Sequence, residues 1–289
     1  MKREFLFKID NKYSNVEIKW FLENVLKCSK NIISKLKQGD FILVNGKREN
    51  VRKKLLEGDE VRIIIPSQKS ENILPNPDIK FRILYEDEDI LVVDKPYGMP
   101  THPSIHHYTD TLANGVCAYI NSPDFTFHPV NRLDRETSGV VLLAKNMLSA
   151  HLLSKQLKEH KIEKTYYAIT KNCPKEDSGT IIAPIARERE SIIKRCVRED
   201  GKYAETLYKV IKSNGDKTLV MTKPVTGRTH QIRVHFAHIG CPLLGDRLYG
   251  TEILNERTRL HCKELTFIHP ITEKKMTITS PEPDDFNIF

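Results

Sequence analysis

Long hydrophobic runs are missing from this sequence. No segment approaches the ~18 consecutive apolar residues that a transmembrane helix requires. The first ten residues, MKREFLFKID, lack the apolar stretch of a signal peptide. These absences predict a cytoplasmic protein without a membrane partner.

The sequence also lacks the cysteine patterns of metal sites and disulfide scaffolds. Its six cysteines stand at positions 28, 117, 173, 196, 241 and 262, so no two form a CxxC motif. None has the spacing of zinc ligands, and we expect all six to be reduced thiols. A Gly-rich phosphate-binding loop and a cluster of metal ligands are missing as well.

Basic residues are concentrated near the N-terminus. The chain has 289 residues, of which 39% are hydrophobic and 29% charged, enough for one large domain or two modest ones with packed cores. Residues 1–70 hold 16 basic and 9 acidic residues, and the remainder holds 30 and 29. This asymmetry favours a polyanion-binding module attached to a near-neutral body, although a lysine-rich soluble domain is the ordinary alternative.

The basic N-terminal segment contains a pattern typical of a helix followed by a short hairpin. In residues 28–37, CSKNIISKLK, the apolar side chains Ile32, Ile33 and Leu36 share one helical face. We place Lys27, Lys30 and Lys37 together on a neighbouring face, where they could follow a phosphate backbone, although such faces are more often simply solvated. A short apolar run at 41–44, an Asn-Gly turn and an alternating strand at 61–65 complete the segment.

This segment resembles the small RNA-binding module first recognised in a small-subunit ribosomal protein. The similar stretches are SKNIISKLKQGDFILVNGK and LLEGDEVRI. Members of that family usually have an arginine-bearing start to the second helix, whereas Ser29, Lys30 and Asn31 stand here. The resemblance implies an RNA-binding unit. The departure at residues 29–31 implies that it binds RNA less tightly than is usual in that family.

The remaining chain reads as a larger α+β body after a linker. Residues 66–80, PSQKSENILPNPDIK, contain three prolines and no clear period. We divide the chain into a small RNA-binding domain (1–70), a linker (71–80) and a catalytic domain (81–289). We expect a hairpin at 81–93, a buried strand at 140–144, a helix at 147–161 and strands at 165–170, 180–183, 204–211 and 217–222. Many strands with few helices indicate a mixed, mainly antiparallel sheet.

Two polar stretches are candidates for chemistry. In residues 128–146, HPVNRLDRETSGVVLLAKN, Asp134 lies on a tight loop before a buried strand, where catalytic groups often occur. In residues 225–250 three histidines stand at spacings that fit no HExxH metal motif. Alternation from 230 to 234 suggests a strand from which Arg233 could reach Asp134, either across an active site or as a structural ion pair.

These stretches, with others, resemble the RluA-type RNA pseudouridine synthases. The matching motifs are DKPYGMPTHPS (94–104), NRLDRETSG (131–139), KTYYA (164–168), TGRTHQIRVH (226–235), GDRLYG (245–250) and LHCKELTFIHP (260–270). They occur in the family's order over residues 80–289. One departure is Asn131, where the family most often has His.

The resemblance implies a mechanism and roles for individual residues. The family detaches uracil from its ribose, turns the base and rejoins it through carbon-5, which needs neither a redox cofactor nor a metal. The resemblance assigns the role of the essential carboxylate to Asp134 and that of the partner guanidinium to Arg233. Tyr166 matches the tyrosine that stacks on the base and helps to remove the carbon-5 proton. Arg132 matches the arginine that replaces the flipped base in the RNA stack.

The expected substrate is ribosomal RNA, with transfer RNA as the alternative, and the chain is expected to act as a monomer. Two other classes of protein remain to be distinguished. A pure RNA-binding protein would not need the Asp134–Arg233 pair. A glycoside or nucleoside hydrolase would release free uracil, but such enzymes usually use two carboxylates, and the close second acid, Glu136, has no such role in the family.

Overall fold

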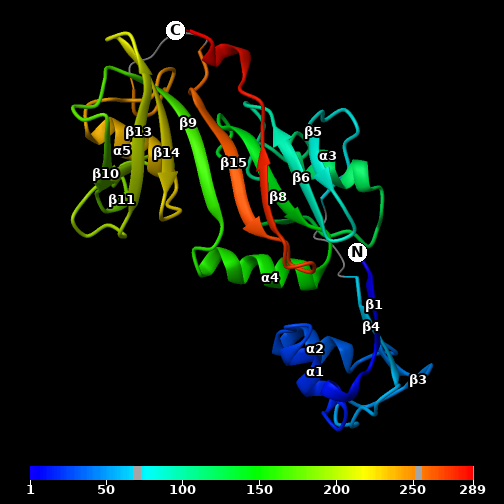
Figure 1. Ribbon diagram of the computed structural model, residues 1–289. Helices are drawn as coiled ribbons and strands as arrows, with labels where there is room; N and C mark the ends of the chain where they lie inside the picture. Colours follow the sequence, from blue (N-terminus) through cyan, green and yellow to red (C-terminus); the bar gives the residue numbers. More distant parts are fainter. Residues whose placement is uncertain (68–72, 251–255, 289) are drawn as a thin grey trace.

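The computed structural model describes residues 1–67, 73–250 and 256–288. Figure 1 shows a small N-terminal unit beneath a larger body built on a long twisted sheet. Antiparallel pairing dominates the sheets of the described residues, which confirms the predicted α+β class with a mixed, mainly antiparallel sheet. Among the described residues, no helix combines the length and the apolar composition that crossing a bilayer requires.

The N-terminal unit has its own sheet and its own core. Its elements are β1 (Arg3–Lys8), α1 (Ile18–Asn24), α2 (Lys30–Leu36), β2 (Ile42–Val44), β3 (Lys47–Arg48) and β4 (Glu60–Ile65), with sheet order β1-β4-β2-β3. Ser29 caps the start of helix α2, because its side chain accepts a hydrogen bond from the Ile32 main-chain amide at 3.3 Å. As predicted, Ile32, Ile33 and Leu36 are buried.

The expectation that Lys27 shares a helical face with Lys30 and Lys37 is wrong for Lys27. This residue precedes α2 and has a left-handed backbone with φ of 55°. It lies between the two helices, so helical periodicity does not apply to it. Lys30 opens α2 and Lys37 caps its end, and all three side chains are exposed.

The body is organised around one long sheet. Within the described residues, ten strands pair in the order β10-β13-β14-β9-β15-β8-β6-β5, with β16 beside β15 and β7 beside β8. Their bounds are β5 (Arg82–Glu86), β6 (Ile90–Lys95), β7 (His128–Pro129), β8 (Ser138–Ala144), β9 (Glu163–Lys171), β10 (Ser178–Ile182), β13 (Glu205–Ser213), β14 (Lys217–Pro224), β15 (Leu260–Ile268) and β16 (Lys275–Thr279). The predicted hairpin and strands of the body are all present.

Strand β8 lies inside this sheet, and every one of its residues is buried. Its partner β15 runs parallel to it, whereas β6 and β7 run antiparallel. At the contact between β8 and β15, Gly139 has a φ of +113°, and a Cβ there would lie 2.2 Å from the Cys262 carbonyl oxygen. Glycine is therefore required at this position.

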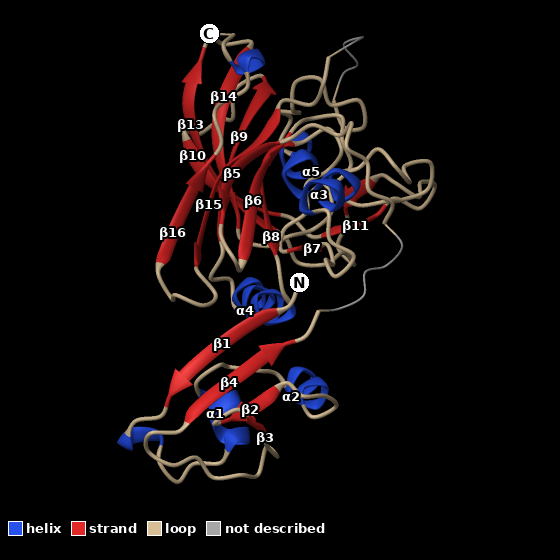
Figure 2. Ribbon diagram, turned by 90° about the vertical axis from the view of Figure 1, so that its right-hand side faces the viewer, coloured by secondary structure: helices blue, strands red, loops and turns tan. Residues whose placement is uncertain are grey.

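Among the described residues, the body also contains three α-helices and a small hairpin. They are α3 (Leu112–Ile120), α4 (Met147–Lys158), α5 (Gln231–His238) and the hairpin of β11 (Ile185–Arg187) and β12 (Arg195–Val197). In Figure 2, α3 and α5 lie on the same side of the sheet, among most of the long loops. Helix α4 lies at the lower end of the sheet, between the body and the N-terminal unit.

The strand expected at 230–234 is wrong, because the structure has helix α5 there. Polar and apolar residues alternate in this segment, but all of residues 231–236 are buried. The side-chain amide of Gln231 donates from Nε2 to the Glu205 carbonyl at 2.8 Å and to the Thr206 hydroxyl at 2.9 Å. Because the polar side chains of this segment form hydrogen bonds inside the protein, their alternation with apolar residues does not mark a strand with one face toward solvent.

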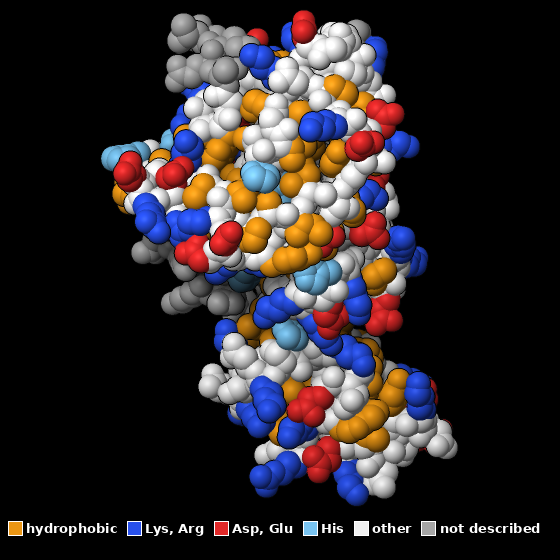
Figure 3. Space-filling view, turned by 90° about the vertical axis from the view of Figure 1, so that its left-hand side faces the viewer, with side chains coloured by type: hydrophobic (Ala, Val, Ile, Leu, Met, Phe, Trp, Pro, Cys, Tyr) orange, Lys and Arg blue, Asp and Glu red, His pale blue; other side chains and the backbone are white. Residues whose placement is uncertain are grey.

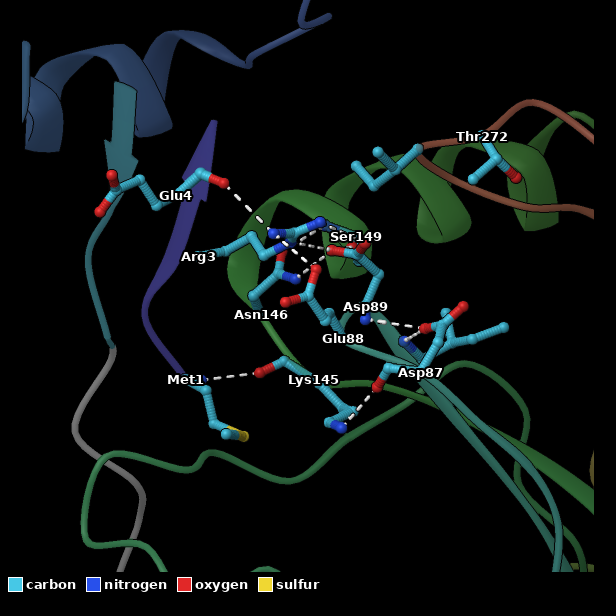
Figure 4. Close-up of polar contacts among 12 residues, drawn as sticks. Met1, Arg3, Glu4, Asp87, Glu88, Asp89, Lys145, Asn146, Ser149 and Thr272 are labelled. Atoms are coloured by element: carbon cyan, nitrogen blue, oxygen red, sulfur yellow. Dashed lines mark hydrogen bonds and ion pairs between the residues drawn. The ribbon is translucent and has the colours of Figure 1, made fainter. Parts of the chain in front are cut away.

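Polar contacts around Asp89 and apolar contacts of α4 join the two units, and Figure 4 shows the polar ones. Arg3 Nε donates to Oδ1 of Asp89 at 3.0 Å, and Arg3 Nη2 donates to Oδ2 at 3.2 Å. Asn146 and Ser149 at the start of α4 also donate to Asp89. The adjacent Met147 and Leu148 are buried in the apolar core of the N-terminal unit. The orientation of that unit is therefore fixed by specific contacts with the body.

Candidate active site

A cleft of about 920 Å³ gathers side chains from three parts of the body. The loop before β8 contributes Asp134 and Arg132, strand β9 contributes Tyr166, and helix α5 contributes Arg233. These are the four catalytic-domain residues singled out from the sequence. The chain therefore brings them into one cavity, although they are up to about a hundred positions apart.

The loop that carries Asp134 is held by buried hydrogen bonds on both sides. The Thr101 hydroxyl donates to the Leu133 carbonyl at 2.8 Å and accepts from the Leu133 amide at 3.2 Å. The Thr137 amide donates to the Asp134 carbonyl at 3.1 Å and closes the turn. The Asp134 side chain keeps 31% exposure, so its carboxylate is open to the cleft.

Asn131, the departure from the family pattern, ties this loop to β8. Its side-chain amide donates to the Val140 carbonyl at 3.0 Å, and its Oδ1 accepts from the Leu142 amide at 2.8 Å. The residue is 5% exposed. Asn131 thus satisfies two main-chain groups of β8 and anchors the loop that leads to Asp134.

A buried lysine supports the same loop from beneath. Lys95, at the end of β6, is fully buried, and its ammonium donates to the carbonyls of Pro96 at 2.9 Å, Met99 at 2.7 Å and Arg135 at 3.3 Å. Burial lowers the pKa of Lys95 to about 7, against the opposing charges of Asp134 and Glu136. Lys95 thereby connects the loop that follows β6 with the loop that carries Asp134.

Arg233 is oriented mainly by Asp246, for which the sequence predicted no role. Its Nε and Nη2 donate to the two carboxylate oxygens of Asp246, each at 2.7 Å, and Asp246 is fully buried. Its Nη1 donates to Oδ2 of Asp134 at 3.4 Å. Burial lowers the pKa of Arg233, but the hydrogen bonds and charge of Asp246 outweigh it, so the pKa ends above its ordinary value. The guanidinium remains charged beside Asp134.

Tyr166 lies in β9, opposite Cys262 of β15, and is 8% exposed at the wall of the cleft. Burial raises the pKa of Tyr166 well above its ordinary value, and the Cys262 side chain and the Asp134 charge add to this effect. The phenol is therefore neutral near pH 7. Tyr167 points to the other side of the sheet, where it packs against the cluster of Ile169, Leu244 and Phe286.

Two further residues, His230 and Tyr249, belong to the site but were not predicted. His230 lines the cleft, with Nδ1 at 2.7 Å from the Tyr249 hydroxyl and Nε2 at 3.9 Å from Oδ2 of Asp134. The guanidinium of Arg233 lies over the Tyr249 ring, 5.1 Å from its centroid. Asp246 and Tyr249 both belong to the GDRLYG motif (245–250), which matches the family, but the sequence predicted no role for either residue.

The other histidines of residues 225–250 do not converge on a metal site. His235 is buried and bonded to the Thr206 hydroxyl and the Ala183 carbonyl, each at 3.0 Å, whereas His238 is exposed. Asp87, Asp89 and His269 lie within 4.8 Å of one another elsewhere in the described residues. That group is held by internal pairs, because His269 bonds to Asp87 at 2.9 Å and Asp89 bonds to Arg3.

The remaining predicted site residues lie at the surface. Arg132 is exposed at the cleft, next to Asp134 in the same loop. Lys27, Lys30 and Lys37 are exposed on the N-terminal unit and do not line the cleft. The structure therefore separates the predicted RNA-contacting lysines from the predicted reaction site.

Comparison with known sequences identifies similar proteins over almost the whole chain. Residues 89–238 match the family model described as RNA pseudouridylate synthase. The uncharacterized RNA pseudouridine synthase YjbO of Bacillus subtilis is 39% identical over 91% of this chain and 94% of its own length. An uncharacterized RNA pseudouridine synthase of Aquifex aeolicus is 38% identical over 97% of this chain and 94% of its own. The ribosomal large subunit pseudouridine synthase D of Xanthomonas campestris is 33% identical over 86% and 80%.

Solved structures show the same likeness in the body. Human RNA Pseudouridylate Synthase Domain Containing 1 superposes with a TM-score of 0.61 and 27% identity, covering 72% of this chain and 86% of that protein. Human RNA Pseudouridylate Synthase Domain Containing 4 gives a TM-score of 0.57 and 28% identity, covering 71% and 90%. The fold of the body is therefore that of these synthases.

Proposed function

The chain belongs to the RNA pseudouridine synthase family, and from that premise we propose that it isomerises specific uridines of structured RNA, with ribosomal RNA favoured over transfer RNA. A similar protein is named for the large ribosomal subunit, which supports that preference. We propose that it acts as a monomer in the cytoplasm and needs no cofactor. Base detachment, rotation and carbon–carbon reattachment exchange no electrons with an external partner.

We propose that Asp134 is the essential acid. The observation that carries this proposal is the convergence of Asp134, Arg233 and Tyr166 on one cleft, with Arg233 Nη1 at 3.4 Å from the Asp134 carboxylate. An ionised carboxylate can capture the sugar cation at carbon-1′ or remove a proton from carbon-2′. Both routes need a charged acid in a confined site, and the fixed guanidinium stabilises that charge.

We propose that Tyr166 packs its ring against the uracil. Direct removal of the carbon-5 proton would require a phenolate, and the raised pKa of Tyr166 disfavours that form. The ring face is suited to stacking, while the hydroxyl remains polar. We assign Arg132, exposed at the cleft, to the space that the flipped nucleotide leaves in the RNA, where a planar cation offsets part of the cost of unstacking.

We propose that the N-terminal unit supplies RNA affinity while the body supplies the reaction. On the face seen in Figure 3, the lower unit carries basic side chains at several places, with acidic and hydrophobic side chains between them. Residues 1–70 hold a surplus of basic over acidic residues of 16 to 9. A cationic surface binds the phosphate backbone without reading its sequence. Because α4 contacts this unit, bound RNA would be held in a defined position relative to the cleft.

The decisive experiment maps pseudouridines in cellular RNA by carbodiimide-induced reverse-transcription stops, with and without this gene. We expect one or more sites to vanish on deletion, to return with the wild-type gene and to stay absent with Asp134→Asn. A map in which no site vanishes on deletion would contradict the proposal. Release of free uracil from the RNA would indicate a hydrolase. If the Asp134→Asn variant replaced the wild-type protein fully in the cell, the protein would instead act by binding RNA.

A further inference from the structure

His230 stands at an unusual point of the backbone. It immediately precedes α5 and has φ of 59° and ψ of 18°, the left-handed region. A residue other than glycine rarely adopts this conformation, and such residues are common at functional sites. The side chain makes no capping hydrogen bond to the helix that it precedes. Its imidazole instead points toward Tyr249 and Asp134.

The hydrogen bonds of Tyr249 favour one of the two tautomers of His230. The Tyr249 hydroxyl oxygen accepts from the Arg195 amide at 2.9 Å. Its own proton is then available to Nδ1 of His230, which lies 2.7 Å away. A neutral imidazole that accepts at Nδ1 carries its hydrogen on Nε2. The Nε2–H group is the one that faces the cleft.

Two donors approach the same oxygen of Asp134. Nε2 of His230 lies 3.9 Å from Oδ2, and Nη1 of Arg233 lies 3.4 Å from it. Hydrogen bonds between catalytic groups are often long without substrate and tighten when substrate binds. Both donors face Oδ2, so neither of them covers the second oxygen, Oδ1.

We propose that His230 is a positioning residue, a neutral imidazole whose Nε2–H, fixed by Tyr249, orients the Asp134 carboxylate together with Arg233. This inference rests on the proposed function of Asp134. A neutral donor orients the acid without adding a second full positive charge, so the carboxylate keeps its reactivity toward the sugar. The Arg195 amide of β12 completes the chain of contacts from the hairpin to the acid.

The charged groups around His230 are compatible with the neutral form. Burial lowers the pKa of His230 from its ordinary value, and Arg233 of α5 and Arg195 of β12 lower it further. Asp134 of the β8 loop and Asp246 oppose this effect. Burial and the two guanidinium groups prevail, so the imidazole is uncharged near pH 7.

The kinetic test uses the full chain and an RNA fragment that contains a mapped target uridine. In His230→Asn the left-handed backbone is retained, because asparagine tolerates it, but the shorter side chain cannot reach Asp134. We expect kcat to fall roughly 10- to 100-fold with KM unchanged. The matched control is His106→Asn, at an exposed histidine with φ of 68°, which should keep the wild-type kcat. A wild-type kcat in His230→Asn would overturn the proposal.

The structural test reads the tautomer directly by nitrogen-15 NMR of histidine-labelled protein, with His230 assigned by its loss in His230→Asn. We expect the Nε2–H tautomer in the wild type and a mixture in Tyr249→Phe, accompanied by a fall in kcat. An Nδ1–H tautomer in the wild type, or an unchanged tautomer and kcat in Tyr249→Phe, would refute the inference. Absence of any pseudouridine product from the wild type would instead refute the proposed function, and the tautomer could still be measured.

Discussion

Arg233 forms a forked ion pair with Asp246 and a single, longer contact with Asp134. The distances are 2.7 Å for both bonds to Asp246 and 3.4 Å for the bond to Asp134. The fully buried acid thus fixes the plane of the guanidinium, and the remaining amino group faces the cleft. Because Asp246 holds the guanidinium, Asp134 stays accessible to the cleft while the cation beside it remains in place.

The first prediction concerns this separation of roles. Replacement of Asp246 by alanine should lower the free energy of unfolding by about 3–5 kcal/mol, because it leaves the buried Arg233 without its forked partner. It should also reduce turnover, since the guanidinium is then free to bind Asp134 more closely. Denaturant unfolding and single-turnover kinetics would measure both effects.

The matched control for Asp246→Ala is Asp200→Ala, which removes an acid that is paired with Arg198 at the surface. Solvent screens such a pair, so stability and turnover should stay at wild-type levels. Equal effects of the two substitutions would contradict the role assigned to Asp246.

The second prediction distinguishes catalysis by Asp134 from binding by the rest of the cleft. Asp134→Asn keeps the shape of the side chain but removes its charge. Turnover should be lost, whereas RNA affinity and the unfolding midpoint should change little, because the side chain is 31% exposed and makes only long contacts. Filter binding and pseudouridine formation on the same RNA would test this, and residual turnover within tenfold of wild type would argue against an essential acid.

Sequence patterns predicted the strands well because apolar runs and turns mark them locally. The hairpin ending at Lys95 and the buried strand β8 are examples in which continuous apolar residues and adjacent turns suffice. Helix α5 was missed because its polar residues are buried and bonded internally. Periodicity assumes that polar side chains face water, and here that assumption fails.

The site itself was only partly predictable. Asp134, Arg233, Tyr166 and Arg132 were found through family motifs, and the structure places them in one cleft. Asp246 and Tyr249 contact Arg233 and His230, which are distant in sequence from the loop that carries Asp134. No local pattern reports such a contact. These contacts became visible only in the fold, which brings α5 against the segment that contains GDRLYG.

The third prediction concerns the lysines of the N-terminal unit. Simultaneous change of Lys27, Lys30 and Lys37 to glutamate should weaken RNA binding and flatten its dependence on salt, because fewer counterions are released. The kcat at saturating RNA should be unchanged, since these residues do not line the cleft. Filter binding over a range of potassium concentrations would measure the effect.

The control for the lysine variant applies the same change of charge to the body. Lys171, Lys175 and Lys209 are exposed there. Their replacement by glutamate should weaken binding less than replacement of the three N-terminal lysines. Equal losses would mean that the general charge of the protein, and not the N-terminal surface, supplies the affinity.

The last prediction concerns acid sensitivity at His261 of β15. Burial, with help from Arg257 and Lys263, lowers the pKa of His261 from 6.5 to about 4. Between these two pH values the unfolded chain takes up a proton at this residue and the folded chain does not, so acid favours unfolding. The contribution of His261 is complete above pH 6.5 and is lost toward pH 4, with a slope of at most about 1.4 kcal/mol per pH unit.

Replacement by asparagine isolates this contribution, because asparagine does not titrate and places a polar atom near the position of Nδ1, which contacts the Ser138 hydroxyl at 2.9 Å. Urea unfolding at pH 7, 6, 5 and 4.5 should show a smaller acid-induced loss of stability in His261→Asn than in the wild type. The exposed His106→Asn should follow the wild-type curve. Parallel pH profiles for all three proteins would show that His261 is not the source, since only a group with different proton affinity in the two states can change the slope.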